Sequence, residues 1–203
     1  GAHGQLGRAL TAALDGAVAV GRDVLDLADP ASVAAFDFSP YGTVVNAAAY
    51  TQVDAAETPQ GRLDAWATNV TGLAALVEAA RRHRALLVHV SSDYVFDGTR
   101  QEHTEDEPLS PLGVYGQTKA AGDALVATLP RHLLLRTSWV IGEGRNFVAT
   151  MAGLADRGIS PSVVDDQHGR LTFTKELVRA VRHLLEVEAP SGTYNVINDG
   201  PVQ

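Results

Sequence analysis

Tyr115 and Lys119, four residues apart, form the pattern in this sequence that points most directly to chemistry. Residues i and i+4 share one face of a helix, so the phenol and the amine would lie side by side. A tyrosine with an ordinary pKa near ~10 is a poor acid at neutral pH, and a neighbouring ammonium lowers that pKa by stabilising the phenolate. The pair therefore predicts a proton donor and its activator. Lys119 could also donate hydrogen bonds to the ribose hydroxyls of a nicotinamide nucleotide.

A hydroxyl group that could act with this pair lies 23 residues upstream of Tyr115, at Ser92. It follows the apolar run 86–90, which is typical of a buried strand. Ligands of open α/β sheets bind outside the carboxyl ends of the strands. We therefore expect Ser92 to hydrogen-bond a substrate carbonyl and to hold it for protonation. The alternative interpretation is that Ser91 and Ser92 merely end the strand.

The chain opens with the glycine-rich sequence GAHGQLG, which leads into a predicted helix at 6–14. Glycines at such a turn let backbone N–H groups approach a pyrophosphate at the helix N-terminus. The spacing differs from the usual G-x-G-x-x-G, and no strand precedes it. A glycine-rich, frayed terminus is therefore an equally good interpretation of this segment alone.

Three positions after the next predicted strand, at 17–20, bear on the choice of nucleotide. Arg22 follows the apolar run 17–20, where an acidic residue would hold a ribose 2′-hydroxyl and an arginine can accept a 2′-phosphate. Arg22 therefore favours NADPH over NADH, although a solvated surface arginine is as good an interpretation. Asp26 and Leu27 follow at a distance suited to the adenine, and Asp26 could equally cap a turn.

The segment 46–51, with the sequence NAAAYT, follows another predicted strand. Its small residues would let the backbone approach a cofactor closely. Asn69 lies in the next predicted helix, where asparagine is a poor helix former. It could reach the active site through water or satisfy a buried backbone group.

These residues must be positioned by a regular alternation of strands and helices. Strands are predicted at 17–20, 43–47, 86–90 and 133–135, and helices at 6–14, 31–36, 62–84 and 114–128. Continuous apolar strands separated by helices indicate a parallel sheet covered on both faces, so the predicted fold class is α/β, a Rossmann-like doubly wound sheet. Residues 97–111 are polar, acidic and bounded by proline, which predicts a loop.

Beyond residue 141 the pattern is less regular. It predicts helices at 147–157 and 175–187 and strands at 162–164 and 194–197. We expect residues 1–140 to form a nucleotide-binding Rossmann domain that lacks its first strand. Residues 141–203 would be mostly an incomplete, small α/β substrate-binding annex, with segments that return to the sheet.

Composition excludes several classes of protein. The 203 residues carry 16 basic and 24 acidic side chains, a formal charge of −8, which argues against nucleic-acid binding. The absence of cysteine excludes disulfides, thiolate metal sites and a thiol nucleophile. No apolar run reaches the ~18 residues of a membrane span. The seven histidines show no metal-ligand spacing, so we expect no catalytic metal, and we expect a cytoplasmic protein.

The combined motifs resemble a known family. GxxGQLG, NAAAYTxVD, SSDYVFDG, VYGxTK and LRTSWV, spread over nearly the whole chain, are similar to the extended short-chain dehydrogenase/reductases. Within that family they are most similar to the dTDP-4-dehydrorhamnose reductases. The resemblance implies NADPH- or NADH-dependent reduction of the C4 ketone of dTDP-6-deoxy-L-lyxo-4-hexulose, with the dTDP-sugar as substrate.

The resemblance also implies a role for individual residues. Tyr115 would be the proton donor, Lys119 its activator and a cofactor ligand, and Ser92 the residue that orients the carbonyl. Asp93 and Trp139 would contact the sugar nucleotide, although a large aromatic residue after a strand is often part of the core. The remaining cofactor contacts would come from Gly4, Gln5, Leu6, Asp26, Leu27, Ala49, Tyr50 and Thr51.

Two features depart from the family pattern. Leu171 stands where DQxGxPT has proline, which puts the geometry of that loop in question. Family members are also longer, so we expect the sequence to be part of a longer natural chain. Two other functions stay open: a 4-ketoreductase for another dTDP-4-keto-deoxysugar of antibiotic biosynthesis, and a non-catalytic NADP-binding regulatory subunit. The sequence does not decide between a monomer and a homodimer.

Overall fold

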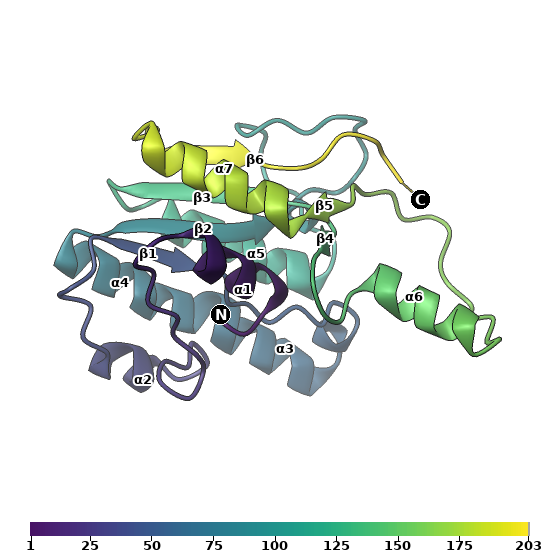
Figure 1. Cartoon of the computed structure of the whole chain (residues 1–203), viewed down its shortest axis with the longest axis horizontal. Helices are drawn as coiled ribbons and strands as arrows, with labels where there is room; N and C mark the ends of the chain where they lie inside the picture. The colour runs from purple at the N-terminus through teal and green to yellow at the C-terminus, as the bar shows by residue number, and fades with distance from the viewer. Residues whose placement is uncertain (203) are drawn as a thin grey trace.

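The computed structural model describes residues 1–202 and contains a four-stranded parallel sheet (Figure 1). The strand order is β1 (Thr43–Asn46), β2 (Leu86–Ser92), β3 (His132–Thr137) and β6 (Gly192–Asn195). All three pairings are parallel. The carboxyl ends of β1, β2 and β3 therefore meet at one edge of the sheet, where the predicted site residues follow them.

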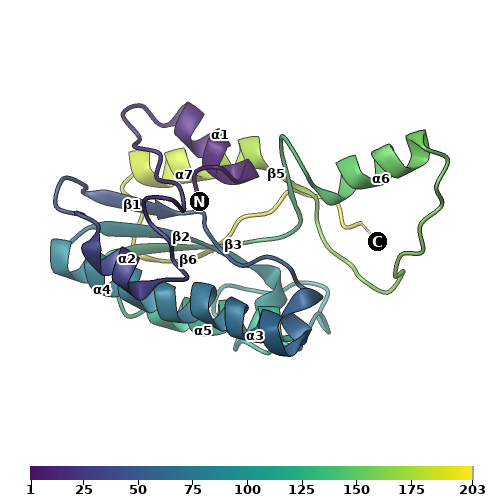
Figure 2. The same cartoon turned by 90° about the horizontal axis from the view of Figure 1, so that it is seen from below.

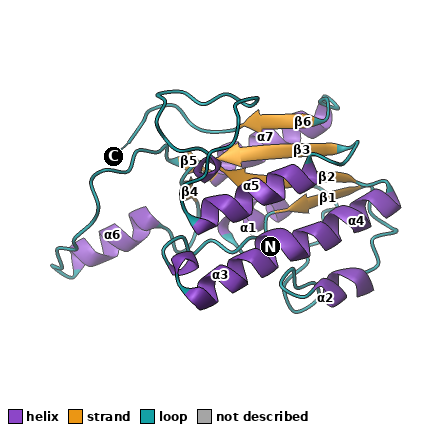
Figure 3. Cartoon of the chain, turned by 180° about the vertical axis from the view of Figure 1, so that it is seen from behind, coloured by secondary structure: helices purple, strands orange, loops and turns teal. Residues whose placement is uncertain are grey.

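Helices cover both faces of this sheet, which confirms the doubly wound α/β class. One face carries α2 (Pro30–Ala35), α3 (Pro59–Trp66), α4 (Leu73–His83) and α5 (Val114–Val126), as Figure 3 shows. The other face carries α1 (Gln5–Ala13) and α7 (Thr174–Glu186), which lie beside each other (Figure 2).

The central strands are apolar on both sides because both of their faces are buried. In β3, Leu133 and Leu135 pack into the cluster with α1 and α7, whereas Leu134 packs into the cluster with α4. Successive side chains of a strand point to opposite faces, so a run of three leucines supplies both cores. This alternation explains why the strand reads as a continuous apolar segment.

The single helix expected at 62–84 is divided into three parts. A π-helical segment, η2 (Ala67–Gly72), separates α3 from α4. Gly72 lies very close to Leu27, in the segment between α1 (Gln5–Ala13) and α2. A Cβ added at Gly72 would lie 1.5 Å from the carbonyl oxygen of Leu27. Single-turn π segments are uncommon and often occur at functional sites.

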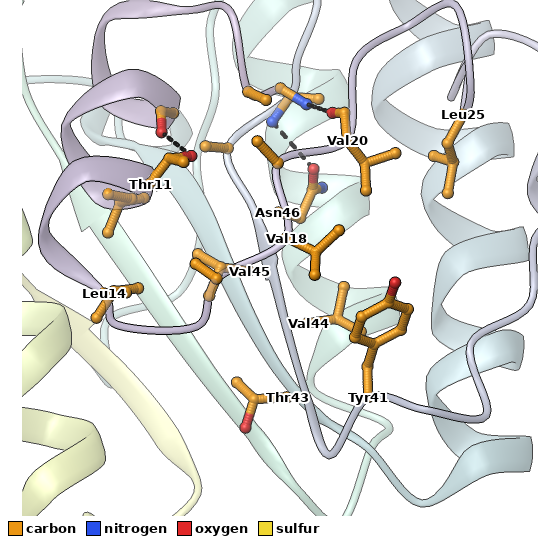
Figure 4. A pocket seen from close by; sticks show the side chains of 18 of the residues that line it. Thr11, Leu14, Val18, Val20, Leu25, Tyr41, Thr43, Val44, Val45 and Asn46 are labelled. Atoms are coloured by element: carbon orange, nitrogen blue, oxygen red, sulfur yellow. Dashed lines mark hydrogen bonds between the residues drawn. The ribbon is translucent and has the colours of Figure 1, made fainter.

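The strand expected at 17–20 is not formed, which corrects that prediction. A strand needs a hydrogen-bonded neighbour, and an open cleft of about 250 Å³ lies between this segment and the free edge of β1 (Figure 4). Its walls are mostly apolar, with Val18, Val20, Val44 and Leu25 among the side chains that point toward the opening. Val18 is 62% exposed, although its type favours burial.

The C-terminal third departs most from expectation. No strand forms at 162–164, and β6 begins two residues earlier than predicted. A short parallel pair, β4 (Val140–Ile141) with β5 (Thr172–Phe173), was not predicted. The helix α6 (Phe147–Asp156) has no buried residue and stands away from the sheet (Figure 2). No helix within residues 1–202 is long and apolar enough to cross a membrane.

Candidate active site

The first two turns of α5 hold Tyr115 and Lys119 beside the carboxyl end of β2. The helix has no side-chain cap of its own at Gly113. Glu57, from the short helix η1 (Ala55–Glu57), instead accepts the Val114 N–H at 2.7 Å. A carboxylate at a helix N-terminus satisfies a free N–H and complements the helix dipole. The turn that carries Tyr115 is therefore fixed by a residue from a separate element.

Lys119 is buried, with 2% of its surface exposed. Its Nζ donates to the Val90 carbonyl at 2.9 Å and lies 3.4 Å from Nε2 of His89. Burial lowers the pKa of Lys119 to about 8, and the nearby Asp123 carboxylate partly opposes this shift. The amine is therefore held in place and is less firmly protonated than an exposed lysine.

The pKa of Tyr115 does not follow the sequence expectation. Burial raises it to about 12, and a hydrogen bond with Ser92 only partly offsets that rise. The negative charge of Asp93 adds to the increase. The phenol therefore keeps its proton at neutral pH, whereas Lys119 was expected to lower the pKa of Tyr115. A fully protonated phenol next to an open cleft is suited to donate a proton.

The turn that follows β2 brings the predicted substrate residues together. Ser92 accepts a hydrogen bond from the Tyr94 N–H at 3.2 Å, which begins the short helix η3 (Asp93–Val95). The Ser92 hydroxyl donates to Asp93 at 3.1 Å, and burial raises the pKa of Asp93. The Tyr94 ring meets the Tyr115 ring edge to face, with centroids 5.5 Å apart. The Ser92 hydroxyl thus lies next to both the Tyr115 phenol and the Asp93 carboxylate.

Trp139 follows β3 and is held by the loop in which Leu171 replaces proline. The Thr172 N–H donates to the Trp139 carbonyl at 2.8 Å. Gly169 packs on the indole, because an added Cβ would lie 2.6 Å from the ring. The loop therefore reaches the site without the proline. Trp139 lines the cleft and also packs against Gly169 of this loop.

A large cleft joins the glycine-rich turn to Tyr115. It has a volume of about 830 Å³, which lies in the range of small-molecule and cofactor sites. Gly7 allows the turn to fold tightly, because an added Cβ would lie 2.0 Å from the Gly1 carbonyl oxygen. The N-terminus of α1, with nine residues and no side-chain cap at Gly4, opens here. The lining includes thirteen residues predicted from the sequence: Gly4, Gln5, Leu6, Arg22, Asp26, Leu27, Ala49, Thr51, Ser92, Asp93, Tyr115, Lys119 and Trp139.

Tyr50 is the one predicted cofactor residue that does not line this cleft. Its ring packs with Ala56 and Ala65 in a separate apolar cluster. Its backbone N–H and carbonyl are both bound by the Asn69 side chain, at 2.8 and 3.1 Å. Asn69 thus satisfies a buried backbone, one of the two roles considered for it.

Two other predicted residues that line the cleft also make hydrogen bonds to the backbone. The carboxylate of Asp26 accepts the Ala28 N–H at 2.9 Å, so it caps a turn and also faces the cleft. The Gln5 side chain accepts the Gly142 N–H at 2.8 Å and so ties α1 to the C-terminal segment.

Sequence reasoning missed a group of buried polar residues behind the site. Asn46 and His89 are direct neighbours in the β1–β2 register, and their side chains lie 3.0 Å apart. Arg136 and Asp123 form a buried ion pair of 2.9 Å. A polar residue in a predicted buried strand was the available signal, but the pairs become visible only once the strand register and helix packing are known.

Comparison with known proteins gives consistent results. A family profile described as the RmlD substrate binding domain matches residues 1–203. The chain is 41% identical over 196 residues to the dTDP-4-dehydrorhamnose reductase of Aggregatibacter actinomycetemcomitans, covering 92% of this chain and 66% of that protein. It is 44% identical over 186 residues to the probable dTDP-4,6-dihydroxy-2-methyloxan-3-one 4-ketoreductase of Streptomyces antibioticus, covering 87% and 62%.

A crystal structure of dTDP-4-dehydrorhamnose reductase from Bacillus anthracis, in complex with NADP, has a TM-score of 0.92 to this chain at 33% identity. The superposition covers 100% of this chain and 74% of that one. The chain spans about two thirds of the length of the curated relatives that it matches.

Proposed function

The chain belongs to the RmlD substrate binding domain family, and from this premise we propose that it reduces the C4 ketone of dTDP-6-deoxy-L-lyxo-4-hexulose with NADPH. The observation that carries the proposal is the convergence of three groups on one cleft. Ser92 ends β2 and lies 23 residues before Tyr115, which shares α5 with Lys119, and all three residues line the same cleft. The relatives' names and the NADP-bound neighbour support the same activity.

The residues of the cleft fit a dinucleotide. The tight glycine turn leaves the N-terminus of α1 open toward the cleft, which suits a pyrophosphate. Arg22 lines the cleft close to Asp26 and supplies a positive charge that suits a 2′-phosphate. We therefore favour NADPH over NADH. The cofactor, when bound, supplies the hydride for C4.

The chain's own residues would supply the proton and orient the ketone. Ser92 is placed to donate a hydrogen bond to the ketone oxygen while Tyr115 donates its proton to the same oxygen as it gains negative charge. Donors directed at a developing oxyanion typically lower the barrier by ~3 kcal/mol each. Lys119 would hold the ribose and present a cation to the phenolate that Tyr115 leaves behind. Asp93 and Trp139 would hold the nucleotide-sugar.

Turnover with a panel of dTDP-4-keto sugars tests this proposal. The full-length natural protein is expected to oxidise NADPH fastest with dTDP-6-deoxy-L-lyxo-4-hexulose. Tight NADPH binding without turnover of any sugar would instead identify a non-catalytic nucleotide-binding subunit.

A second candidate function is favoured by one comparison. The Streptomyces antibioticus relative, named as a probable 4-ketoreductase of a different dTDP sugar, matches this chain as closely as the rhamnose relatives do. Faster turnover of another dTDP-4-keto-deoxysugar in the panel would identify the chain as a 4-ketoreductase of that sugar. A cytoplasmic location and a homodimer are further proposals, and light scattering of the purified protein tests the dimer.

A further inference from the structure

A chain of buried polar contacts runs from the backbone after β1 to the active-site lysine. The Ala48 N–H lies 3.0 Å from Oδ1 of Asn46, and Figure 4 shows this bond to the Asn46 side chain. Nδ2 of Asn46 lies 3.0 Å from Nδ1 of His89. Nε2 of His89 lies 3.4 Å from Nζ of Lys119. The three side chains are 5%, 2% and 2% exposed, so water does not compete for these contacts.

The direction of each hydrogen bond in this chain is fixed. A backbone N–H can only donate, so the Asn46 atom that faces Ala48 must be its oxygen. The amide nitrogen of Asn46, which also only donates, then faces Nδ1 of His89, and Nδ1 must accept. Burial and the nearby Lys119 charge lower the pKa of His89 well below its usual value, so the ring is neutral and carries one proton. That proton must therefore be on Nε2, the nitrogen that faces Lys119.

The Nε2–H of His89 affects the two forms of Lys119 in opposite ways. An ammonium group has only N–H donors, so it meets another donor, whereas a neutral amine has a lone pair that can accept from Nε2–H. The ring thus favours the neutral amine. Asp123, on the same helix as Lys119, favours the ammonium, and its charge is shared with Arg136 on β3. The negative charge of Asp93, which follows the end of β2, raises the pKa of Tyr115.

We propose that His89 is a positioning residue, which Asn46 locks in the Nε2–H form so that it destabilises the ammonium form of Lys119. The inference rests on the proposed function for its meaning in catalysis, since Lys119 is the predicted activator and cofactor ligand. Its physical content, a fixed tautomer and a lysine whose charge depends on it, does not depend on which reaction the protein catalyses. The sequence position of His89, three residues before Ser92 within the strand, gave no indication of this role.

The tautomer can be measured in the wild-type protein. NMR of the full-length natural protein labelled with ¹⁵N-histidine distinguishes Nδ1–H, Nε2–H and doubly protonated rings. The signal of His89, identified by its loss in His89→Gln, is expected to show the neutral Nε2–H form near neutral pH. A neutral Nδ1–H ring or a charged ring would overturn the proposal, whatever the behaviour of the variants.

The effect on Lys119 can be measured by its own titration. With ¹³C-labelled lysine, the Lys119 signal is identified by its loss in Lys119→Arg. In His89→Gln the side-chain oxygen can turn toward Nζ and accept from it, so the Lys119 midpoint is expected to rise by about one pH unit. His132→Gln is the matched control. His132 is a buried histidine at the start of β3, with Nδ1 2.7 Å from the Leu129 carbonyl, and its replacement should leave the Lys119 midpoint unchanged.

The outcomes separate this proposal from the proposed function. A folded His89→Gln protein with an unchanged Lys119 midpoint would overturn the positioning role even if the wild type reduces the sugar. A raised midpoint in a protein that reduces no dTDP-sugar would support the positioning role and count against the function. In an active enzyme, the alkaline limb of the kcat/KM profile should move upward with the Lys119 midpoint.

Discussion

Burial gives Tyr115 the properties of an acid that keeps its proton until a basic oxygen arrives. With its pKa raised to about 12, the phenol is protonated at every pH at which the fold is expected to work. Tyr115→Phe removes that proton and little else from the packing. We expect kcat to fall by about 10²–10⁴-fold, with the Kd for NADPH changed less than about threefold. Steady-state kinetics and fluorescence titration measure both, and near-normal kcat would contradict the assignment.

Lys119 should make stability depend on pH in a specific direction. Its pKa is about 8 in the folded protein and 10.5 when unperturbed, so the unfolded chain binds more protons between these values. The free energy of unfolding should therefore rise with pH across this window, relative to Lys119→Met, which lacks the titrating group. Urea unfolding of both proteins across this pH range tests the sign. A constant difference between the two would contradict the lowered pKa.

At this scale the sequence predicted the residues that contact the cleft, because their spacing relative to strand ends could be read directly. Ser92 was found in this way, and Tyr115 and Lys119 were found from their four-residue spacing on a predicted helix. The expectation that Lys119 lowers the pKa of Tyr115 is not met in the structure, where burial raises that pKa and the opposing contribution is the hydrogen bond with Ser92. His89 was not found, because its function depends on its pairing with Asn46 across two strands.

The π-helical segment between α3 and α4 exists at the place where Asn69 leaves the helix pattern to bind other elements. Its side chain holds the Tyr50 backbone and also donates to Oγ1 of Thr118 on α5 at 3.0 Å. Asn69→Ala would leave the partly buried N–H and carbonyl of Tyr50 without these partners, which we expect to cost about 1 kcal/mol, because about 1–3 kcal/mol is typical of fully buried groups. Chemical denaturation measures this cost.

A matched control lies two turns earlier, where the exposed Gln60 bonds only to Asp64 on the same helix. Gln60→Ala should change the free energy of unfolding by less than about 0.5 kcal/mol. Equal effects of the two substitutions would contradict the role of Asn69. The helix itself was predictable from its apolar pattern, but its division was not, because the contacts that favour the π turn lie outside the segment.

The strand expected at 17–20 shows the limit of pattern reading at the element scale. Its apolar run is compatible with a strand, but a strand is defined by its hydrogen-bonded neighbour, and this segment faces a cleft. The leucine run of β3 was predicted correctly because it is buried on both faces, so its composition alone carries the signal.

For the whole molecule, the free edge of β1 and the apolar cleft beside it suggest room for one more strand. We propose that one further strand pairs with β1 at this edge, parallel to it. Hydrogen exchange on the full-length natural protein is expected to show the β1 amides as strongly protected as those of β2. Rapid exchange of the alternate β1 amides that face the cleft would contradict this arrangement.

The C-terminal third gives a second prediction at this scale through α6. Its exposed apolar side chains include Phe147 and Val148, at 57% and 44% exposure, and they stand away from the sheet. Such a helix is stable when something covers its apolar face. Sequence periodicity predicted the helix but not its partner. In Phe147→Trp of the full-length protein, the fluorescence of the introduced tryptophan should be protected from a soluble quencher. Quenching as strong as that of free tryptophan would contradict the expectation that α6 is covered.

The most direct test of the account follows a labelled hydride to its destination. The full-length protein is supplied with NADPH deuterated at the reactive carbon and with dTDP-6-deoxy-L-lyxo-4-hexulose, and the product is analysed by NMR. We predict one deuterium on C4 of the sugar, with the nucleotide intact, and no product from Tyr115→Phe on the same timescale. Deuterium at another carbon, no transfer to this sugar, or an unimpaired Tyr115→Phe enzyme would contradict the account.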